Sequence, residues 1–351
     1  MKFAAAVALA LVLIVAAVWF VAAGPGNDID DVQGYRPVET PADEPVTVVV
    51  ESGEGSDSIA DELKKTGAID SATQFRVLVA FLGYGPLLQA GEYEFTRDTP
   101  ELDVVYRIRR GLVSTKSVTV VEGWRLEEIA DAVAEQGIPR NDFIAAARRL
   151  DYDFPFLEGL RTGERLDGYL FPATYTIRRR DTARDVVQRM LQAFADSLPQ
   201  TLEQQATDLG LTLHETITIA SIIEREAVLP EERPVMAQVF LRRLRQGISL
   251  EADPTVQFAL ANDADSVAEF GYWKQGLTTE DLEVASPYNT YVEGGIPPGP
   301  ICSPRLDSMN AVVNPADTNY LYFVAKPDGS HAFAETFQEH LDNIEAFGGG
   351  E

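Results

Sequence analysis

An internal repeat in the first half of the chain most constrains its fold. Val46–Val49 recurs as Val118–Val121, and Ile59–Asp61 recurs as Ile129–Asp131. Further matches follow in the same order: Gly67 with Gly137, Phe75 with Phe143, Gly91-Glu92-Tyr93 with Gly168-Tyr169, and Asp103–Val105 with Asp185–Val187. The β-branched runs predict strands, and a glycine after an apolar segment is typical of a helix C-terminus. The matches predict a strand–helix–helix–strand–helix unit that occurs twice, at 46–115 and 116–195. Chance similarity between two small α/β modules is the alternative.

The N-terminus carries an uncharged apolar run, Ala4–Ala23, just after Lys2. A helix of about 20 residues spans the roughly 30 Å of hydrocarbon in a bilayer. The lysine before the run and the acidic residues after it predict a cytoplasmic N-terminus. We therefore expect a single-pass signal anchor at 1–24 and a flexible acidic linker at 25–45. A cleavable signal that ends at Val21-Ala22-Ala23 is the alternative, and either segment would export the rest of the chain.

Composition excludes several classes of function. The net charge of −26 over 351 residues argues against binding to nucleic acid or to anionic lipid headgroups. Cys302 is the only cysteine, so no disulfide can form within the chain. The three histidines are scattered, and the sequence has no glycine-rich phosphate loop and no Gly-x-Ser-x-Gly element. We expect no metal, no cofactor, and no hydrolysis by serine, cysteine or zinc.

Helix and turn signals predict a mixed α+β domain at 196–347. Thr212 and Glu215 form a capping-box pattern, which predicts a helix that runs through Ala227 and ends before Pro230. Further helices are expected at 234–246, from an N-cap at Asp253, at 306–313 and at 335–347. A Pro327-Asp328-Gly329 turn between the runs Tyr320–Val324 and His331–Phe333 predicts a β-hairpin.

Two glutamates lie in the helix predicted to end at Ala227, in the segment Ala220–Ala227. Its centre is apolar on all sides, and burying a carboxylate is costly unless it is paired or protonated. Glu224 lies on the side of the small residues Ala220 and Ser221, which leave room for a ligand, whereas Glu226 lies on the opposite side among isoleucines. This placement favours Glu224 as a catalytic acid. Glu226 is then expected to be a structural carboxylate paired with an arginine among Arg242, Arg243 and Arg245. A solvated helix end is the alternative for the whole segment.

The loop Ser286–Tyr291 is a second candidate for the site. Carbohydrate sites use aromatic faces against sugar rings and a few placed polar groups in an apolar cleft. Tyr288, Asn289 and Tyr291 are therefore predicted sugar contacts, and the prolines that follow would stiffen the loop. A structural connector packed by its own tyrosines is the alternative.

Five segments in the right order resemble the YceG-like endolytic murein transglycosylases, the MltG family. They are Leu166–Pro172, Ala220–Glu226, Asp253–Val256, Ser286–Tyr291 with Gly295–Ile301, and Tyr320–Val324. The resemblance covers nearly the whole chain after the linker. It departs from the family pattern at Asp167, where the family usually has glutamate, and at Ala173, where it usually has aspartate.

The resemblance implies an α+β protein: a membrane anchor, LysM-like small α/β modules at 46–115 and 116–195, and a catalytic domain at 196–347. It implies that the first glutamate of the Ser-Ile-x-Glu-x-Glu element, Glu224, is catalytic. The implied reaction cuts the MurNAc-β-1,4-GlcNAc bond of nascent glycan strands and leaves a 1,6-anhydro end. Implied partners are peptidoglycan strands and peptidoglycan synthases (penicillin-binding proteins), met on the outer or periplasmic face of the cell membrane. Asp253 and Glu226 are further expected substrate contacts.

Two other functions remain open from the sequence. In a hydrolytic muramidase, Glu226 or Asp253 would supply a second carboxylate, as ordinary glycosidases require. In a non-catalytic peptidoglycan-binding scaffold, the LysM-like repeats would bind glycan and the C-terminal domain would be structural. Analysis of the digestion products distinguishes the muramidase and the scaffold from the transglycosylase.

Overall fold

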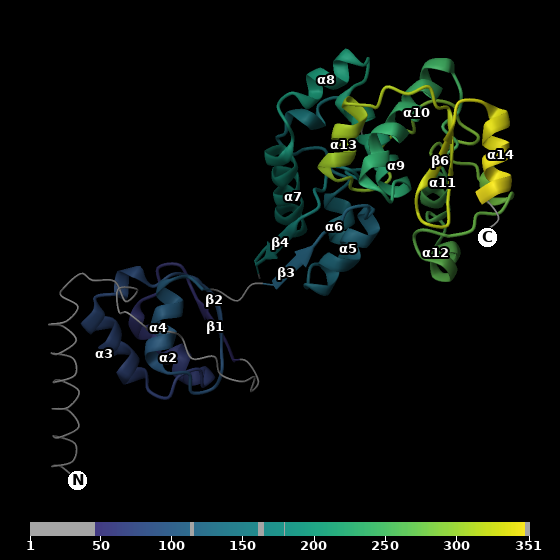
Figure 1. The fold of residues 1–351 in the computed structure, drawn as a ribbon. Helices are drawn as coiled ribbons and strands as arrows, with labels where there is room; N and C mark the ends of the chain where they lie inside the picture. Colours follow the sequence, from purple (N-terminus) through teal and green to yellow (C-terminus); the bar gives the residue numbers. More distant parts are fainter. Residues whose placement is uncertain (1–45, 113–115, 161–164, 179, 348–351) are drawn as a thin grey trace, which may run out of the picture. The chain divides into compact units, whose positions relative to one another are not determined.

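The computed structural model describes residues 46–112, 116–160, 165–178 and 180–347 (Figure 1). The predicted signal anchor at 1–24 and linker at 25–45 lie outside these residues. Within the described part, no helix is long and apolar enough to cross a membrane. The chain divides into two compact units, and the division falls after Thr115.

The first unit packs three helices on a two-stranded sheet. Strand β1 (Val46–Val50) pairs antiparallel with β2 (Gly91–Phe95), with Val48 opposite Tyr93. The helices are α2 (Ser56–Thr66), α3 (Ala72–Leu82) and α4 (Glu101–Arg109). Alternate strand residues face these helices and are buried with Ile59, Leu63, Phe75, Val104 and Ile108. Gly67 ends α2 at φ 79°, a conformation that glycine adopts without steric cost.

The second unit opens with the same order of elements. Strand β3 (Lys116–Thr119) pairs antiparallel with β4 (Thr174–Ile177). Helices α5 (Leu126–Glu135) and α6 (Arg140–Ala146) lie between the strands in the chain, and α7 (Ala183–Ser197) follows them. The strand–helix–helix–strand–helix repeat predicted from the sequence is therefore confirmed as topology.

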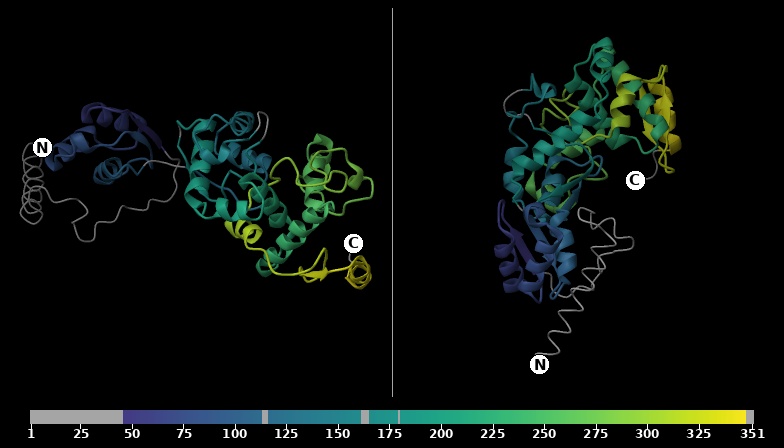
Figure 2. Two further views of the ribbon diagram at one scale, coloured as in Figure 1. Left: turned by 90° about the horizontal axis from the view of Figure 1, so that it is seen from above. Right: turned by 90° about the vertical axis from the view of Figure 1, so that its left-hand side faces the viewer.

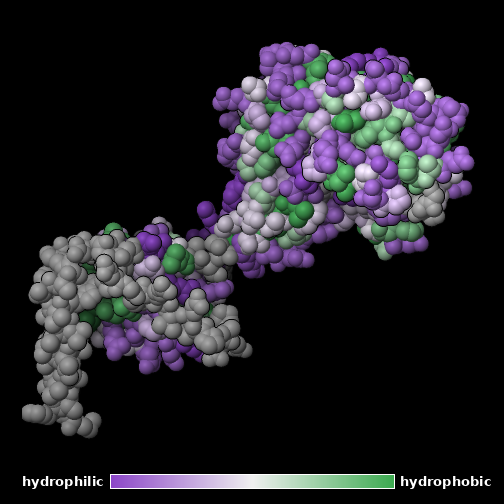
Figure 3. All heavy atoms as spheres, viewed as in Figure 1, coloured by the Kyte–Doolittle hydropathy of each residue, from purple (hydrophilic) through white to green (hydrophobic). Residues whose placement is uncertain are grey.

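The remaining elements are mostly helical, and the predicted mixed α+β class is confirmed. They are α8 (Leu202–Asp208), α9 (Leu213–Glu226), α10 (Arg233–Gln246), α11 (Asp253–Leu260), α12 (Ala264–Phe270), α13 (Leu306–Val313), β5 (Tyr322–Ala325), β6 (His331–Ala334) and α14 (Phe337–Phe347). The β5–β6 hairpin and α14 lie at the edge of this unit in both views of Figure 2. Hydrophilic and apolar side chains are interspersed on the face seen in Figure 3.

One hydrophobic core runs through the second unit. It extends from Val118 in β3 to Val313 at the end of α13 and includes most of the apolar face of α9. The repeat-like module predicted at 116–195 and the catalytic domain predicted at 196–347 thus share a core. Buried Arg125 links the two regions, because its guanidinium donates to the carbonyl of Phe258 in α11. The same guanidinium pairs with Glu127 at 2.6 Å.

Candidate active site

Helix α9 forms the floor of the candidate site. Thr212 Oγ1 accepts from the amide of Glu215, and the Glu215 carboxylate accepts from the amide of Thr212, so the predicted capping box is confirmed. Every residue from Thr216 to Ile223 is buried, as the apolar pattern predicts. Glu224 and Glu226 lie in the last turn, where the helix reaches the surface of the core.

Glu224 sits in a polar cage. Its carboxylate accepts hydrogen bonds from the Arg305 amide at 3.1 Å, Arg305 Nε at 2.8 Å and Ser308 Oγ at 2.7 Å, and its side chain is 2% exposed. Three donors, one of them a guanidinium N–H, thus enclose the carboxyl group and fix its position. The expectation that apolar groups surround the Glu224 carboxyl is therefore wrong.

The small-residue side of α9 is covered. Ser221 Oγ accepts from the amide of Ile301, and the Cys302 thiol donates to the carbonyl of Ser221. The segment that carries Arg305 and Ser308 continues from these residues into α13. Because the side chains of Ala220 and Ser221 are small, the backbone of residues 301–302 can pack closely against this side of the helix. A chain segment, and not a ligand, therefore fills the space beside them.

Glu226 is the contrasting carboxyl group. It is half-buried, and it forms no hydrogen bond or ion pair with any residue that the structure describes. Burial, together with the nearby Asp253 carboxylate, raises the pKa of Glu226 to about 8. A group with this pKa is mostly protonated at neutral pH and can donate a proton.

The arginine partner predicted for Glu226 is wrong. Arg243 pairs with Glu251, and Arg242 donates to Asn319 Oδ1. None of the three predicted arginines, the exposed Arg245 included, is hydrogen-bonded or ion-paired to Glu226 in the described part of the chain. The helical wheel could not show that these arginines project toward β5 and the residues before it.

Asp253 and Tyr291 lie beside Glu226. The Tyr291 hydroxyl donates to Asp253 Oδ1 at 2.6 Å, and the pKa of Tyr291 is raised by burial and by the charges of Asp253 and Glu226. Asp253 is exposed and is the first residue of α11, whose N-cap is Ala252 and not Asp253 as predicted. The structure thus brings together three of the predicted site residues: one carboxyl group with a raised pKa, one exposed carboxylate and one tyrosine.

The loop Ser286–Tyr291 has its own internal support. Asn289 is fully buried, its amide donates to the carbonyls of Leu282 and Val284, and its oxygen accepts from the Tyr291 amide. Both polar atoms of Asn289 are thus engaged within the protein, and a sugar contact at this residue stays a prediction. Tyr288 is half-buried against Phe258, with ring centroids 4.7 Å apart. Internal hydrogen bonds of Asn289 therefore hold the loop in shape, and the loop places Tyr291 beside Asp253.

Asp167 has a structural task in this chain. Its Oδ1 accepts from the amide of Leu126 at the start of α5, and its Oδ2 pairs with Arg165 at 2.6 Å. The side chain is buried. The shorter carboxylate, where the family usually has glutamate, therefore holds the N-terminus of α5.

Sequence reasoning missed Arg305, Ser308 and Trp273. The Arg225 guanidinium stacks on Trp273 at 4.0 Å, and Trp273 Nε1 donates to Glu128. These contacts join α9 to α5 through a segment distant in sequence. No local pattern marks such residues, since each acts only through a partner far along the chain.

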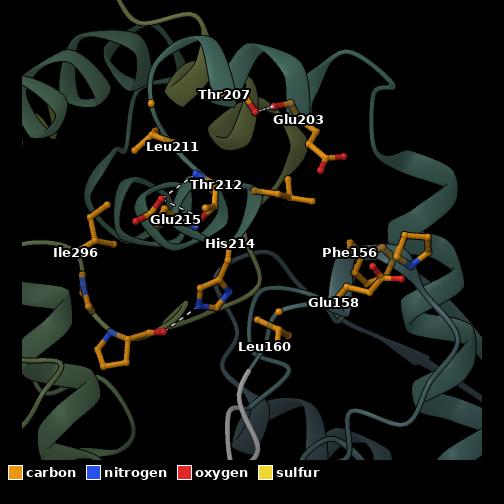
Figure 4. A pocket seen from close by; sticks show the side chains of 16 residues that line it. Phe156, Glu158, Leu160, Glu203, Thr207, Leu211, Thr212, His214, Glu215 and Ile296 are labelled. Carbon is orange, nitrogen blue, oxygen red and sulfur yellow. Dashed lines mark hydrogen bonds between the residues drawn. The ribbon is translucent and has the colours of Figure 1, made fainter.

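A pocket of about 810 Å³ opens at the other end of α9 (Figure 4). Phe156, Leu160, Leu211 and His214 line it. His214 Nε2 lies 2.9 Å from the carbonyl of Pro298, and Nδ1 lies 2.7 Å from the Tyr169 hydroxyl. Because a carbonyl only accepts, Nε2 carries the proton toward Pro298. At 1.5 Å per residue, this pocket is about 18 Å along the helix from Glu226.

The fold and the site define a class: an α+β protein whose buried helix α9 ends in two carboxyl groups, one hydrogen-bonded and one unpaired with a raised pKa. The model of the YceG-like family matches residues 48–346, and the chain belongs to that family. The endolytic murein transglycosylase of Bacillus subtilis is 32% identical, over 87% of this chain and 85% of that protein. The endolytic murein transglycosylase of Streptococcus pneumoniae is 26% identical, over 88% of this chain and 59% of that longer protein.

The fold also matches a solved structure. The crystal structure of a YceG-like protein of Listeria monocytogenes has a TM-score of 0.58 and 29% sequence identity with this chain. The match covers 85% of this chain and 98% of that one. The matched region therefore includes residues from both compact units of this chain.

Proposed function

We propose that this protein is an endolytic lytic transglycosylase that cuts the MurNAc-β-1,4-GlcNAc bond of peptidoglycan. The names of the homologous enzymes support the substrate and the reaction class. The observation that carries the assignment of the acid is Glu226, an unpaired carboxyl whose pKa is raised to about 8. The proposal therefore moves the catalytic role from Glu224, as expected from the sequence, to Glu226.

A single carboxyl group can perform both proton transfers of this reaction. Glu226 donates its proton to the glycosidic oxygen, the bond from that oxygen to C1 of the muramoyl residue breaks, and N-acetylglucosamine leaves with a hydroxyl. The resulting carboxylate then takes the proton of the muramoyl 6-hydroxyl as that oxygen bonds to C1. The product is a 1,6-anhydro end, Glu226 is again protonated, and no water is consumed.

The resting state of Glu226 suits this sequence of steps. A general acid works best when its pKa lies near the working pH, because it is then protonated yet still able to release the proton. Glu224 is less suited, because its oxygens already accept three hydrogen bonds, two of them from Arg305. We assign Glu224 to fixing the position of the last turn of α9, and thus of Glu226.

Asp253 favours one alternative, hydrolysis by a muramidase. Its exposed carboxylate lies close enough to raise the pKa of Glu226, and a second carboxylate could activate a water. The hydrogen bond from Tyr291 occupies one of its oxygens. The two reactions differ in product: hydrolysis adds one water to the new end, and the anhydro reaction does not.

We further propose that the enzyme acts at the outer face of the cell membrane, held there by the segment 1–24. The repeated small modules at 46–115 and 116–195 would act as LysM-like glycan contacts. Nascent strands and the synthases that make them would then be its substrates and partners. The strongly acidic composition fits an exported enzyme that avoids anionic lipid surfaces.

The test uses the full-length protein in detergent with purified peptidoglycan, and mass spectrometry of the products. Anhydro ends that disappear in Glu226→Gln would support the proposal. Products heavier by one water would identify a muramidase. The wild-type protein is also tested in a membrane-embedded form. If neither folded preparation cleaves the glycan, the remaining function is the non-catalytic scaffold.

A further inference from the structure

A second groove lies beside the candidate site. It has a volume of about 270 Å³ and is formed by the start of α10 and one face of α13. Pro230 and Arg233 come from one side, and Asp307, Asn310 and Asn314 come from the other. Asp307 and Asn310 are three positions apart, so they share one face of α13, and Asn314 is the residue directly after the helix. Helices α9, α10 and α13 pack together in the second unit (Figure 1).

Arg233 is the unusual member of this groove. Its residue is 4% exposed, and its Nε is buried without a hydrogen-bond partner. Among the residues that the structure describes, no carboxylate pairs with it. The other two buried arginines, Arg125 and Arg243, each have a carboxylate partner, Glu127 and Glu251 respectively.

The carboxylate nearest to Arg233 in sequence is already engaged. Both oxygens of Glu232 are hydrogen-bonded to His331, at 2.8 Å from its amide and 2.7 Å from its ring Nδ1. Burying part of a charged group without a partner is destabilising. An anion that entered the groove would offset this destabilisation, so the chemistry of the groove suits a carboxylate.

The opposite wall carries complementary groups. Asp307 is exposed, and neither its carboxylate nor the half-buried side-chain amide of Asn310 has a hydrogen bond within the described residues. Asn314 is braced by Gln205 and by the carbonyl of Asn310. A cation deep in the groove, an anion at the rim and a free amide between them fit a short peptide with a carboxylate and a primary amine.

The groove lies close to the proposed acid. Pro230 follows Glu226 by four residues, so their Cα atoms are at most about 14 Å apart. On the other wall, Ser308 is next to Asp307 and binds Glu224. The stem peptide of peptidoglycan starts on the same muramoyl residue whose bond is cut, and three extended residues reach about 10 Å.

We propose that this groove binds the stem peptide of the muramoyl residue being cut, with Arg233 on a peptide carboxylate and Asp307 on the amine of the diamino acid. The proposal rests on the proposed function, since it takes the substrate from it. It makes the enzyme selective for glycan that still carries peptides. Arg233 is then a substrate-binding residue outside the proton-transfer step.

Binding can be measured apart from cleavage. The probe is the tripeptide L-alanyl-γ-D-glutamyl-meso-diaminopimelate, titrated calorimetrically into full-length protein. Arg233→Gln is expected to weaken binding at least tenfold, and Arg233→Lys less. Arg245→Gln, an exposed arginine on the same helix, is the matched control and should bind like wild type. Wild-type protein that fails to bind the tripeptide, or equal binding by Arg233→Gln, would overturn the proposal.

Cleavage assays on two substrates add a second measurement, a ratio of kcat/KM values that a purely structural role of Arg233 would leave unchanged. Strands with stem peptides are compared with strands stripped by an amidase. The ratio of kcat/KM for the two substrates should fall about tenfold in Arg233→Gln through KM, with little change on stripped strands. An equal loss on both substrates would show a structural role and refute the peptide site. If Arg233→Gln fails to fold in thermal melting, Asp307→Asn and Asn310→Ala decide by the same ratio.

Failure of this proposal is distinguishable from failure of the proposed function. Tripeptide binding without cleavage of either substrate would keep the groove and refute the enzyme. Cleavage of both substrates at equal rates, without tripeptide binding, would keep the enzyme and refute the groove.

Discussion

The two glutamates of the last turn of α9 should respond in opposite ways to the same substitution. Glu224→Gln keeps the shape of the side chain but removes its charge. Of the three hydrogen bonds, the amide oxygen can retain the two from the Arg305 amide and Ser308, and the bond from Arg305 Nε is lost. A bond to a charged group contributes about 1.5–3 kcal/mol.

The cost is moderated by solvent at one end of this contact. The Arg305 side chain is 39% exposed, so water partly replaces the lost partner. We expect Glu224→Gln to lower the free energy of unfolding by about 2 kcal/mol. For a unit of about 150–250 residues that corresponds to about 4–8 °C in Tm. Cleavage below Tm should persist, because Glu224 transfers no proton.

Glu226→Gln should do the reverse. It removes no hydrogen bond in the described structure, so the free energy of unfolding should change by no more than about 0.5 kcal/mol. Removing the acid should lower kcat about 10²–10⁴-fold. Thermal melting by circular dichroism and product analysis by mass spectrometry give the two quantities on the same samples. An inactive Glu224→Gln with unchanged Tm, beside an active Glu226→Gln, would refute the assignment.

Three further predictions follow from the same contacts. Because the pKa of folded Glu226 is raised from 4.5 to about 8, cleavage should decline as pH rises through about 8. The folded state holds this proton while the unfolded state has lost it, so the free energy of unfolding should fall between about pH 4.5 and 8, and Glu226→Gln should lack that slope in urea titrations at each pH. Asp253→Asn removes a like charge and should move the alkaline limb of the rate profile to lower pH; an unmoved limb would show that burial alone sets this pKa. Asn289→Ala removes three hydrogen bonds at about 1 kcal/mol each, so it should lower Tm, and an unchanged Tm with a higher KM would restore a sugar-binding role.

Local signals in the sequence were sufficient for the elements of secondary structure. The capping box at Thr212 marked the start of α9, because cap and helix are fixed by residues three positions apart. The helix predicted at 306–313 matches α13, and the turn Pro327-Asp328-Gly329 joins β5 and β6. The predicted strand at Tyr320–Val324 begins two residues later, and the predicted helix at 335–347 begins at Phe337.

The sequence narrowed the site but could not rank its two glutamates. Helical periodicity placed Glu224 on a side of small residues, and small residues admit a neighbouring backbone as readily as a ligand. The segment that fills this space carries Arg305, which lies 81 residues later in the chain. The hydrogen-bonded state of Glu224 and the unpaired state of Glu226 are therefore consequences of packing, which periodicity does not report.

The sequence by itself determined the α+β class, the repeated small module, the limits of α9 and the family, because these depend on contacts within a few residues or on motifs in order. Tertiary structure alone decided that the second repeat shares a core with the domain that follows, that Asn289 braces its loop, and that the pKa of Glu226 is raised. Each of these depends on which distant groups remove water and supply charge around a side chain. Burial and pairing set the pKa of a carboxyl group, and both are properties of the folded chain.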